Sequence, residues 1–278
     1  MANNIRINNR VGSTLQVGNN SVERAYYGSS LVYTPSFFDE DAITYIDAVE
    51  SADGQELEVG VKVTINNFVS GCKADGNWDA IKASCILAGA RTLNGALVPL
   101  KGPAPTNFNF VSADYDRKTG LKGDKSTKYL NSNRNASDDD QTDVHMSVFA
   151  TEENTGGTSS RFLAASNDLE ILDDADLSVR SRINSSSLIN HPVPTLTGFF
   201  VVSRDNSDGY DFYAFGAAGT AESSANRTVD AAYTVFARPS GDRTDARLSF
   251  YSIGSALDTV SFRNRVSTLM TEIEAALT

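Results

Sequence analysis

The sequence contains only two cysteines, two histidines and one tryptophan in 278 residues. Cys72 and Cys85 lie thirteen positions apart without clustered histidines, which fits neither a zinc site nor a disulfide framework. We therefore expect two buried structural thiols, as is usual for proteins of a reducing compartment.

Long apolar runs and basic clusters are also missing. No segment approaches the ~18 consecutive apolar residues that span a bilayer, so we expect no membrane insertion. The N-terminus has neither a basic nor an apolar signal region, so we expect no signal peptide and synthesis in a cytoplasm. The formal net charge of −11, with no local cluster of lysines and arginines, argues against nucleic-acid binding.

Motifs for catalysis are absent as well. The chain has no Gly-x-Ser-x-Gly elbow, no His-Glu-x-x-His and no phosphate loop. His145 lies in an alternating, strand-like segment, and His191 precedes Pro192 in an expected loop. We therefore expect no enzyme. One alternative stays open, because a glycosidase needs only two carboxylates about 5–10 Å apart, and the chain has 35 acidic residues.

The first third of the chain predicts a β arm and then helices. Residues 25–33 read as a hairpin with Gly28-Ser29 at the turn. A helix capped by Ser36 or Asp39 follows, and a second helix carries Leu57, Val61, Ile65 and Phe68 on one face. Further on we expect a short helix around Trp78 and two strand-like pieces separated by Gly89 and Gly95.

The rest of the chain predicts a β-sandwich or barrel closed by a helix. Short apolar segments alternate with turn signals such as Asp208-Gly209 and Ser240-Gly241. The clearest expected strands are 144–149, 177–183, 198–204, 210–215, 233–237 and 247–253. The strand over 177–183 alternates between apolar and polar residues, so one of its faces should be wet. Phe262, Val266, Leu269, Ile273 and Leu277 then recur at helical spacing.

Four segments resemble one group of phage virion proteins that carry a C-terminal concanavalin-like (LamG-like, jelly-roll) sandwich. They are 25–33, 78–98 beginning Trp78-Asp79-Ala80-Ile81-Lys82, 117–130 from Arg117 to Leu130, and 246–254 from Ala246 to Gly254. The resemblance implies a mainly β fold with a jelly-roll sandwich and a C-terminal helix. It divides the chain into an N-terminal β attachment arm (1–35), a helical linker with entry strands (36–102) and the sandwich (103–278).

The resemblance also implies a function. We expect a structural protein of the virion, of the tail-fibre type, that presents a lectin-like sandwich to glycans on the host surface. Its N-terminal region would bind other virion proteins, and it would form a homo-oligomer, with a trimer as the first expectation. The alternatives are a capsid or tail decoration protein that cements neighbouring subunits, and a glycan depolymerase. The group has no shared catalytic or binding residues to carry over.

Two acidic segments are candidate sites. Asp173, Asp174 and Asp176 supply the hard oxygens that calcium prefers, although short acidic loops are usually just solvated. We expect no other cofactor. Asp205, Asn206, Asp208 and Tyr210 combine hydrogen-bonding groups with an aromatic ring, the mixture that binds sugars. An ordinary polar turn leading into a core strand is the competing interpretation of this second segment.

Overall fold

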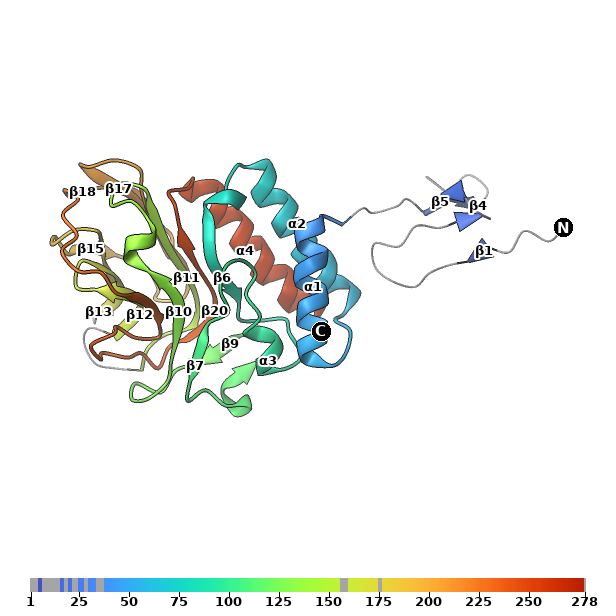
Figure 1. Cartoon of the computed structure of the whole chain (residues 1–278), viewed down its shortest axis with the longest axis horizontal. Coiled ribbons are helices and arrows are strands. Elements are labelled where there is room, and N and C mark those ends of the chain that lie inside the picture. Colours follow the sequence, from blue (N-terminus) through green and yellow to red (C-terminus); the bar gives the residue numbers. More distant parts are fainter. Residues whose placement is uncertain are drawn as a thin grey trace.

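The computed structural model describes residues 38–155, 160–174 and 177–277, and the backbone of five short strands within the first 33 residues. Two antiparallel sheets form a β-sandwich (Figure 1). In sheet order, the seven-stranded sheet consists of β15 (Ile189–Pro192), β14 (Ser178–Ile183), β13 (Leu169–Asp174), β12 (Ser160–Ser166), β19 (Ala232–Val235), β10 (Tyr129–Asn135) and β7 (Thr106–Phe108).

The second sheet has eight strands. Its order is β18 (Ala217–Glu222), β17 (Gly209–Ala214), β16 (Gly198–Arg204), β11 (Val144–Glu152), β20 (Arg247–Gly254), β9 (Gly120–Lys122) and β8 (Tyr115–Asp116), and β6 (Ile81–Ile86) also pairs with β20. The predicted sandwich with a C-terminal helix is therefore confirmed. Every expected strand between 144 and 253 is present, with ends that shift by at most a few residues.

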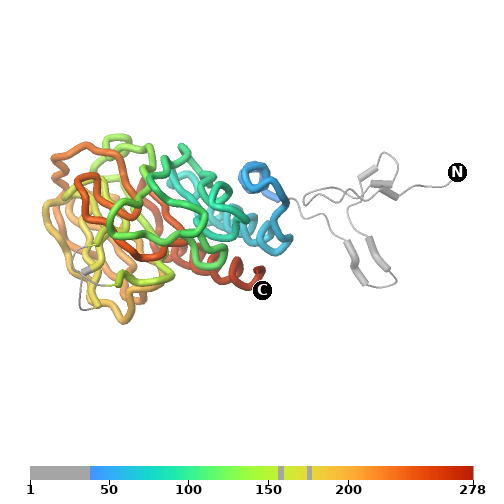
Figure 2. The backbone as a smooth tube through the Cα atoms, turned by 90° about the horizontal axis from the view of Figure 1, so that it is seen from below, coloured from blue at the N-terminus to red at the C-terminus, as the bar shows by residue number. Residues whose placement is uncertain are grey.

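Three helices form a third layer on the outer face of the eight-stranded sheet (Figures 1 and 2). They are α1 (Glu40–Asp53), α2 (Val59–Ala74) and α4 (Thr259–Ala276). The side chain of Asp39 caps α1 by accepting from the backbone N–H of Asp41, and Gly54 ends the helix at φ +70°. Asp258 caps α4 in the same way. The capping signals of α1 were readable from the sequence, and α1 begins where they predict.

The layers enclose two separate hydrophobic cores. One lies between the sheets and includes Phe162, Phe200 and Tyr251. The other lies between the helices and the eight-stranded sheet, where the Phe262 ring of α4 packs 5.8 Å from Phe199 and 6.2 Å from Phe250, measured between centroids. The central strands β16 and β20 thus have both faces buried, which explains the continuous apolar run from Phe199 to Val202.

Helices α2 and α4 approach each other closely because α2 has glycine at two contact points. A Cβ atom at Gly60 would lie 2.8 Å from the Cβ of Ala276, and one at Gly71 would collide with the guanidinium of Arg265. Arg265 also pairs with Asp75 at the end of α2, with Nε 2.7 Å from Oδ2. These contacts fix α2, near the start of the described chain, against α4 at its end.

The described part of the expected linker, residues 38–102, packs directly on the sandwich. Its strand β6 pairs with β20 along Ile81–Ile86, and its helices cover the sheet. The expected helix at Trp78 is a 3-10 turn, η1 (Trp78–Ala80). The second expected strand-like piece is wrong, because Leu93–Ala96 forms a short helix, α3, whose N-cap Thr92 bonds to the N–H of Gly95. Two further 3-10 turns are η2 (Ser112–Asp114) and η3 (Ala136–Asp138).

The first 33 residues contain β1 (Ile5–Arg6), β2 (Gln16–Val17), β3 (Asn20–Ser21), β4 (Ala25–Tyr27) and β5 (Ser30–Tyr33). Strands β4 and β5 pair antiparallel, as the hairpin prediction requires. The expected turn residues Gly28 and Ser29 lie outside the described residues. The attachment role of this arm stays a prediction. No helix in the described part of the chain is long and apolar enough to cross a membrane.

Both cysteines are free and buried, as predicted. Burial raises the pKa of each thiol, Cys72 and Cys85, to about 12. Because the thiolate is the reactive form, we expect neither thiol to react with a disulfide reagent at pH 8 in the native protein. Both should react after unfolding in concentrated guanidinium chloride. Rapid modification of either cysteine in the folded protein would contradict this assignment.

Candidate functional site

The candidate site is the outer face of the seven-stranded sheet, on the side opposite the helices. Helices α1, α2 and α4 lie against the other sheet, and no described α-helix covers this face (Figure 1). Residues that alternate with the core-facing ones point outward here, and several are arginines: Arg161, Arg180 and Arg182. The wet face expected for the strand over 177–183 is thus part of a larger polar surface.

A fully buried carboxylate organises this surface. Glu170 on β13 is 0% exposed and lies between the neighbouring strands β12 and β14. Its Oε2 atom accepts from Nε of Arg161 at 3.0 Å, and its Oε1 atom accepts from Nε of Arg182 at 2.9 Å. A buried carboxylate is stable only when it is paired and hydrogen-bonded, and the two guanidiniums provide this while shielding Glu170 from water.

A tight turn adds a third guanidinium. Arg238 and Gly241 exchange two backbone hydrogen bonds, of 3.1 and 2.9 Å, and Gly241 has φ +126°, a conformation that favours glycine. The predicted Ser240-Gly241 turn is therefore confirmed. The turn places NH1 of Arg238 3.9 Å from Oε2 of Glu170, while its terminal nitrogens also donate to the side chains of Asn167 and Asp242.

A fourth arginine stacks on an aromatic pair. The guanidinium carbon of Arg243 lies 5.1 Å from the ring centroid of Tyr129 on β10. Tyr129 in turn stacks on Phe108 of β7, with centroids 4.3 Å apart and planes inclined by 4°. The Nε atoms of Arg238 and Arg243 are buried and have no hydrogen-bond partner among the described residues. Glu170 on β13 and Tyr129 on β10 are separated by three strand spacings across the sheet, roughly 14 Å.

The predicted glycan loop is only partly available to a ligand. Asp205, Asn206 and Asp208 are exposed between β16 and β17, but Asn206 Oδ1 is used by the N–H groups of Asp208 and Gly209, both at 2.9 Å. Tyr210 is 1% exposed, and its hydroxyl lies 3.0 Å from Oγ of Ser181 inside the core. Tyr210 therefore offers no ring to a sugar, because its strand position points it between the sheets.

The expected calcium loop is in part a strand. Asp173 and Asp174 belong to β13, and Asp173 is buried. The side chain of Asp174 and all of Asp176 lie outside the described residues. Among the residues that the structure does describe, no group of three or more histidine, cysteine or acidic side chains is placed to hold a metal ion. Calcium binding at Asp173, Asp174 and Asp176 stays a prediction.

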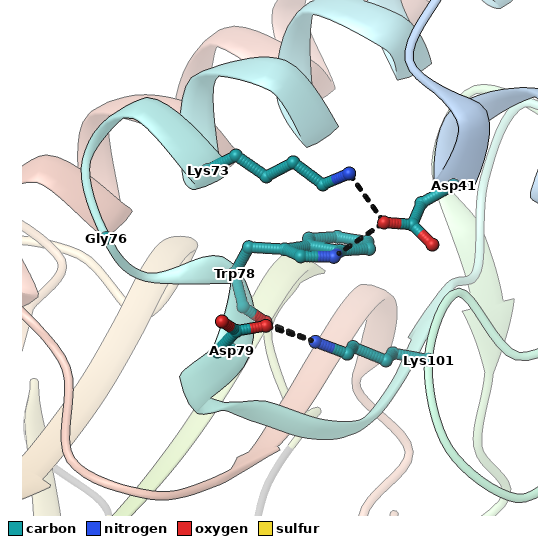
Figure 3. Close-up of a pocket in the computed structure, with 6 residues that line it drawn as sticks. All are labelled: Asp41, Lys73, Gly76, Trp78, Asp79 and Lys101. Carbon is teal, nitrogen blue, oxygen red and sulfur yellow. Dashed lines mark hydrogen bonds and ion pairs between the residues drawn. The ribbon is translucent and has the colours of Figure 1, made fainter.

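A pocket of about 440 Å³ lies at the junction of α1, α2 and η1 (Figure 3). The Trp78 indole lines it and lies between the ammonium groups of Lys73 and Lys101. Nε1 of Trp78 donates to Asp41 at 3.1 Å, and the Lys101 ammonium donates to the Trp78 carbonyl at 2.6 Å.

The charged side chains that line this pocket form ion pairs with one another. Lys73 lies 2.6 Å from Oδ2 of Asp41, and this contact lowers the pKa of the Asp41 carboxyl. Lys101 lies 3.6 Å from Asp79, and burial lowers the pKa of the Lys101 ammonium. Trp78 itself is only 7% exposed. The contacts of Trp78 with Asp41 and Lys73 thus hold η1 against α1 and α2. The pocket is therefore a weaker candidate for ligand binding than the arginine-rich face.

Both histidines are buried in strands. His145 on β11 has Nδ1 2.6 Å from the Ser255 carbonyl, so Nδ1 donates, and Nε2 accepts from the Ser252 hydroxyl at 2.8 Å. His191 lies in β15, whereas the sequence placed it in a loop, and its Nε2 lies 2.7 Å from Oγ of Ser181. Burial lowers the pKa of each imidazole to about 4. These histidines are neutral core residues at pH 7.

Sequence reasoning did not find the arginine-rich face. Arg180 and Arg182 alternate with Val179 and Ile183, a signal that marks an outward-facing cationic pair within an acidic chain. The other members come from separate segments, and only the sheet order brings β12, β13, β14 and the turn after β19 together.

No protein-family model and no curated protein matches the chain. Among solved structures, it is similar to a mutant Trypanosoma rangeli sialidase with trans-sialidase activity, at 12% identity and a TM-score of 0.48, over 76% of this chain and 40% of that one. It is also similar to domain 4 of an extracellular arabinanase of Geobacillus stearothermophilus in complex with arabinotriose. That match has 12% identity and a TM-score of 0.38, over 59% of this chain and 82% of the domain.

These matches correct one expectation. The sequence predicted that the chain is no enzyme, and the similarity to several Trypanosoma rangeli sialidases contradicts that prediction at the level of the fold. The chain spans about 40% of the length of the sialidases that it matches. At such low identity the similarity concerns the fold alone, and it assigns no activity or residue to this chain.

Proposed function

We propose that this chain is a bacteriophage virion component whose β-sandwich binds glycan on the host surface. The virion part of the proposal is supported by the segments 25–33, 78–98, 117–130 and 246–254, which resemble phage virion proteins. The N-terminal region would attach the chain to other virion proteins, and the chain would act as a homo-oligomer, with a trimer as the first expectation.

One observation carries the binding part of the proposal. The outer face of the seven-stranded sheet is left uncovered by the described helices and combines guanidinium donors with the stacked rings of Tyr129 and Phe108. Guanidiniums donate fixed pairs of hydrogen bonds to oxygen ligands, and an aromatic ring provides an apolar face that packs against a sugar. The buried Glu170 carboxylate holds Arg161 and Arg182 in place before a ligand arrives.

The test is binding of the purified chain to an array of bacterial surface glycans. We expect the chain to bind at least one of them, and Tyr129→Ala to weaken that binding about tenfold, since stacking of one ring contributes on the order of 1 kcal/mol. The matched control is Tyr213→Ala. Tyr213 also lies beneath an arginine, Arg263, at 4.7 Å, but on the helix-covered sheet.

Three outcomes would contradict the proposal. Failure to bind any glycan would remove the binding function, and an equal loss in Tyr129→Ala and Tyr213→Ala would remove this face as the site. Imaging of intact particles provides the third test. A sandwich that lies flat between capsid or tail subunits, with its outer face covered by them, would make the protein a cement. Release of reducing sugar from a bound polymer would add cleavage to binding.

A further inference from the structure

We infer that the glycan bound by this face is acidic, and that the turn from Arg238 to Arg243 is where its carboxylates bind. This inference rests on the proposed glycan-binding function and names its ligand class. The whole chain carries a formal net charge of −11, so an acidic polymer would be repelled by most of its surface. A site for such a polymer must therefore be locally cationic.

The arginine-rich face meets that requirement. Three guanidiniums, those of Arg161, Arg182 and Arg238, lie around two described carboxylates, Glu170 and Asp242. The guanidinium of Arg243 lies beside them over the ring of Tyr129. Glu170 is already engaged by Arg161 and Arg182, and Asp242 by Arg161 and Arg238. No described carboxylate pairs with Arg243, which leaves an excess of positive charge at the end of the turn.

The hydrogen-bond inventory of the turn points to a missing acceptor. The Nε atoms of both Arg238 and Arg243 are buried without a partner among the described residues. Buried donors in native proteins are nearly always satisfied, so an unpartnered pair calls for an explanation. An incoming carboxylate binds a guanidinium through two parallel N–H groups, and at Arg243 it would meet a guanidinium already placed over the ring of Tyr129.

The turn is rigid enough to present these groups. Beyond the paired bonds between Arg238 and Gly241, the N–H of Phe236 donates to Phe162 and the N–H of Thr244 donates to Phe236, at 2.8 and 3.0 Å. The arginines therefore stand on a segment fixed at both ends to the sandwich. Pre-ordering of this kind reduces the entropy lost when a ligand binds.

The experiment compares acidic polysaccharides with their carboxyl-reduced forms, in which each carboxylate has become a hydroxymethyl group. Polygalacturonate, alginate and hyaluronate serve as probes. We expect the full chain to bind at least one acidic polymer ten or more times more tightly than its reduced form, with affinity that falls as salt is added. The double variant Arg238→Gln/Arg243→Gln should lose about tenfold in affinity for the acidic polymer.

The matched control is Arg263→Gln, which removes an arginine stacked over a tyrosine on the opposite side of the domain. It should leave affinity unchanged. Arg243→Lys keeps the charge and should lie between the wild type and Arg243→Gln. Circular dichroism and the thermal midpoint establish that each variant is folded.

The outcomes separate the two proposals. Equal binding of acidic and reduced polymers, or binding to neutral glycans alone, would overturn the acidic ligand while leaving glycan binding in place. Selective binding to an acidic polymer that the double variant retains in full would overturn the assignment to this turn. Binding to no polymer of either kind, here and on the surface-glycan array, would remove the proposed function and this inference together.

Discussion

Lowering the pH from about 7.5 to about 5 should reduce the free energy of unfolding by roughly 4 kcal/mol through the two histidines alone. Burial holds the pKa of His145 and of His191 at about 4 in the folded chain, against about 6.5 for an unperturbed imidazole. Below pH 6.5 the unfolded chain therefore binds protons that the folded chain does not accept.

The direction of the stability change with pH follows from this difference in proton binding. A depressed folded-state pKa contributes stability that is fully present above pH 6.5 and is lost as the pH falls toward 4. The paired carboxylates of Asp41 and Glu58, whose pKa values are lowered by contacts with Lys73 and Arg117, lose their contribution only at lower pH. The interval between pH 7 and pH 5 thus isolates the histidines.

Urea unfolding at several pH values measures the effect. The variant His191→Gln should be less stable at pH 7, because it loses the bond to Ser181, but its stability should fall about half as steeply between pH 7 and pH 5 as that of the wild type. If the wild type is equally stable at both pH values, these imidazoles are not buried as described.

The variant Glu170→Ala should lose about 3–5 kcal/mol of folding free energy, the cost of leaving buried charges without their partner. Its carboxylate is 0% exposed and lies 3.0 Å from Nε of Arg161 and 2.9 Å from Nε of Arg182. Without it, the guanidiniums of Arg161 on β12, Arg182 on β14 and Arg238 in the turn after β19 repel one another across the vacated position on β13. Thermal and urea unfolding at pH 7 measure the loss.

Glu152→Ala is the matched control. Glu152 also pairs with two cations, Lys122 at 2.7 Å and Arg247 at 2.6 Å, but its side chain is 44% exposed. Solvent screens such a pair, so we expect a loss of less than about 1 kcal/mol. Equal losses in the two variants would show that Glu170 is not an organising centre of the outer face.

The sequence by itself determined most of the secondary structure of the described chain. Short apolar segments between turn signals predicted six of the ten strands from Val144 to Gly254, and a spacing of three to four residues predicted α1, α2 and α4. Local rules suffice here, because caps such as Asp39 and turns such as Ser240-Gly241 bond within a few residues. The small helix at Leu93–Ala96 was misread as a strand, since four residues carry too little periodicity.

Only the tertiary structure decided which faces are covered and which residues meet. Alternation indicates that a strand has two faces, but it does not say which one faces a second sheet, a helix or solvent. Tyr210 was for that reason taken as exposed, although it points into the core. The arginine-rich face joins Arg161, Glu170, Arg182 and Arg238, which four different segments contribute. Long-range contacts of this kind arise from strand order, and local spacing in the sequence does not encode them.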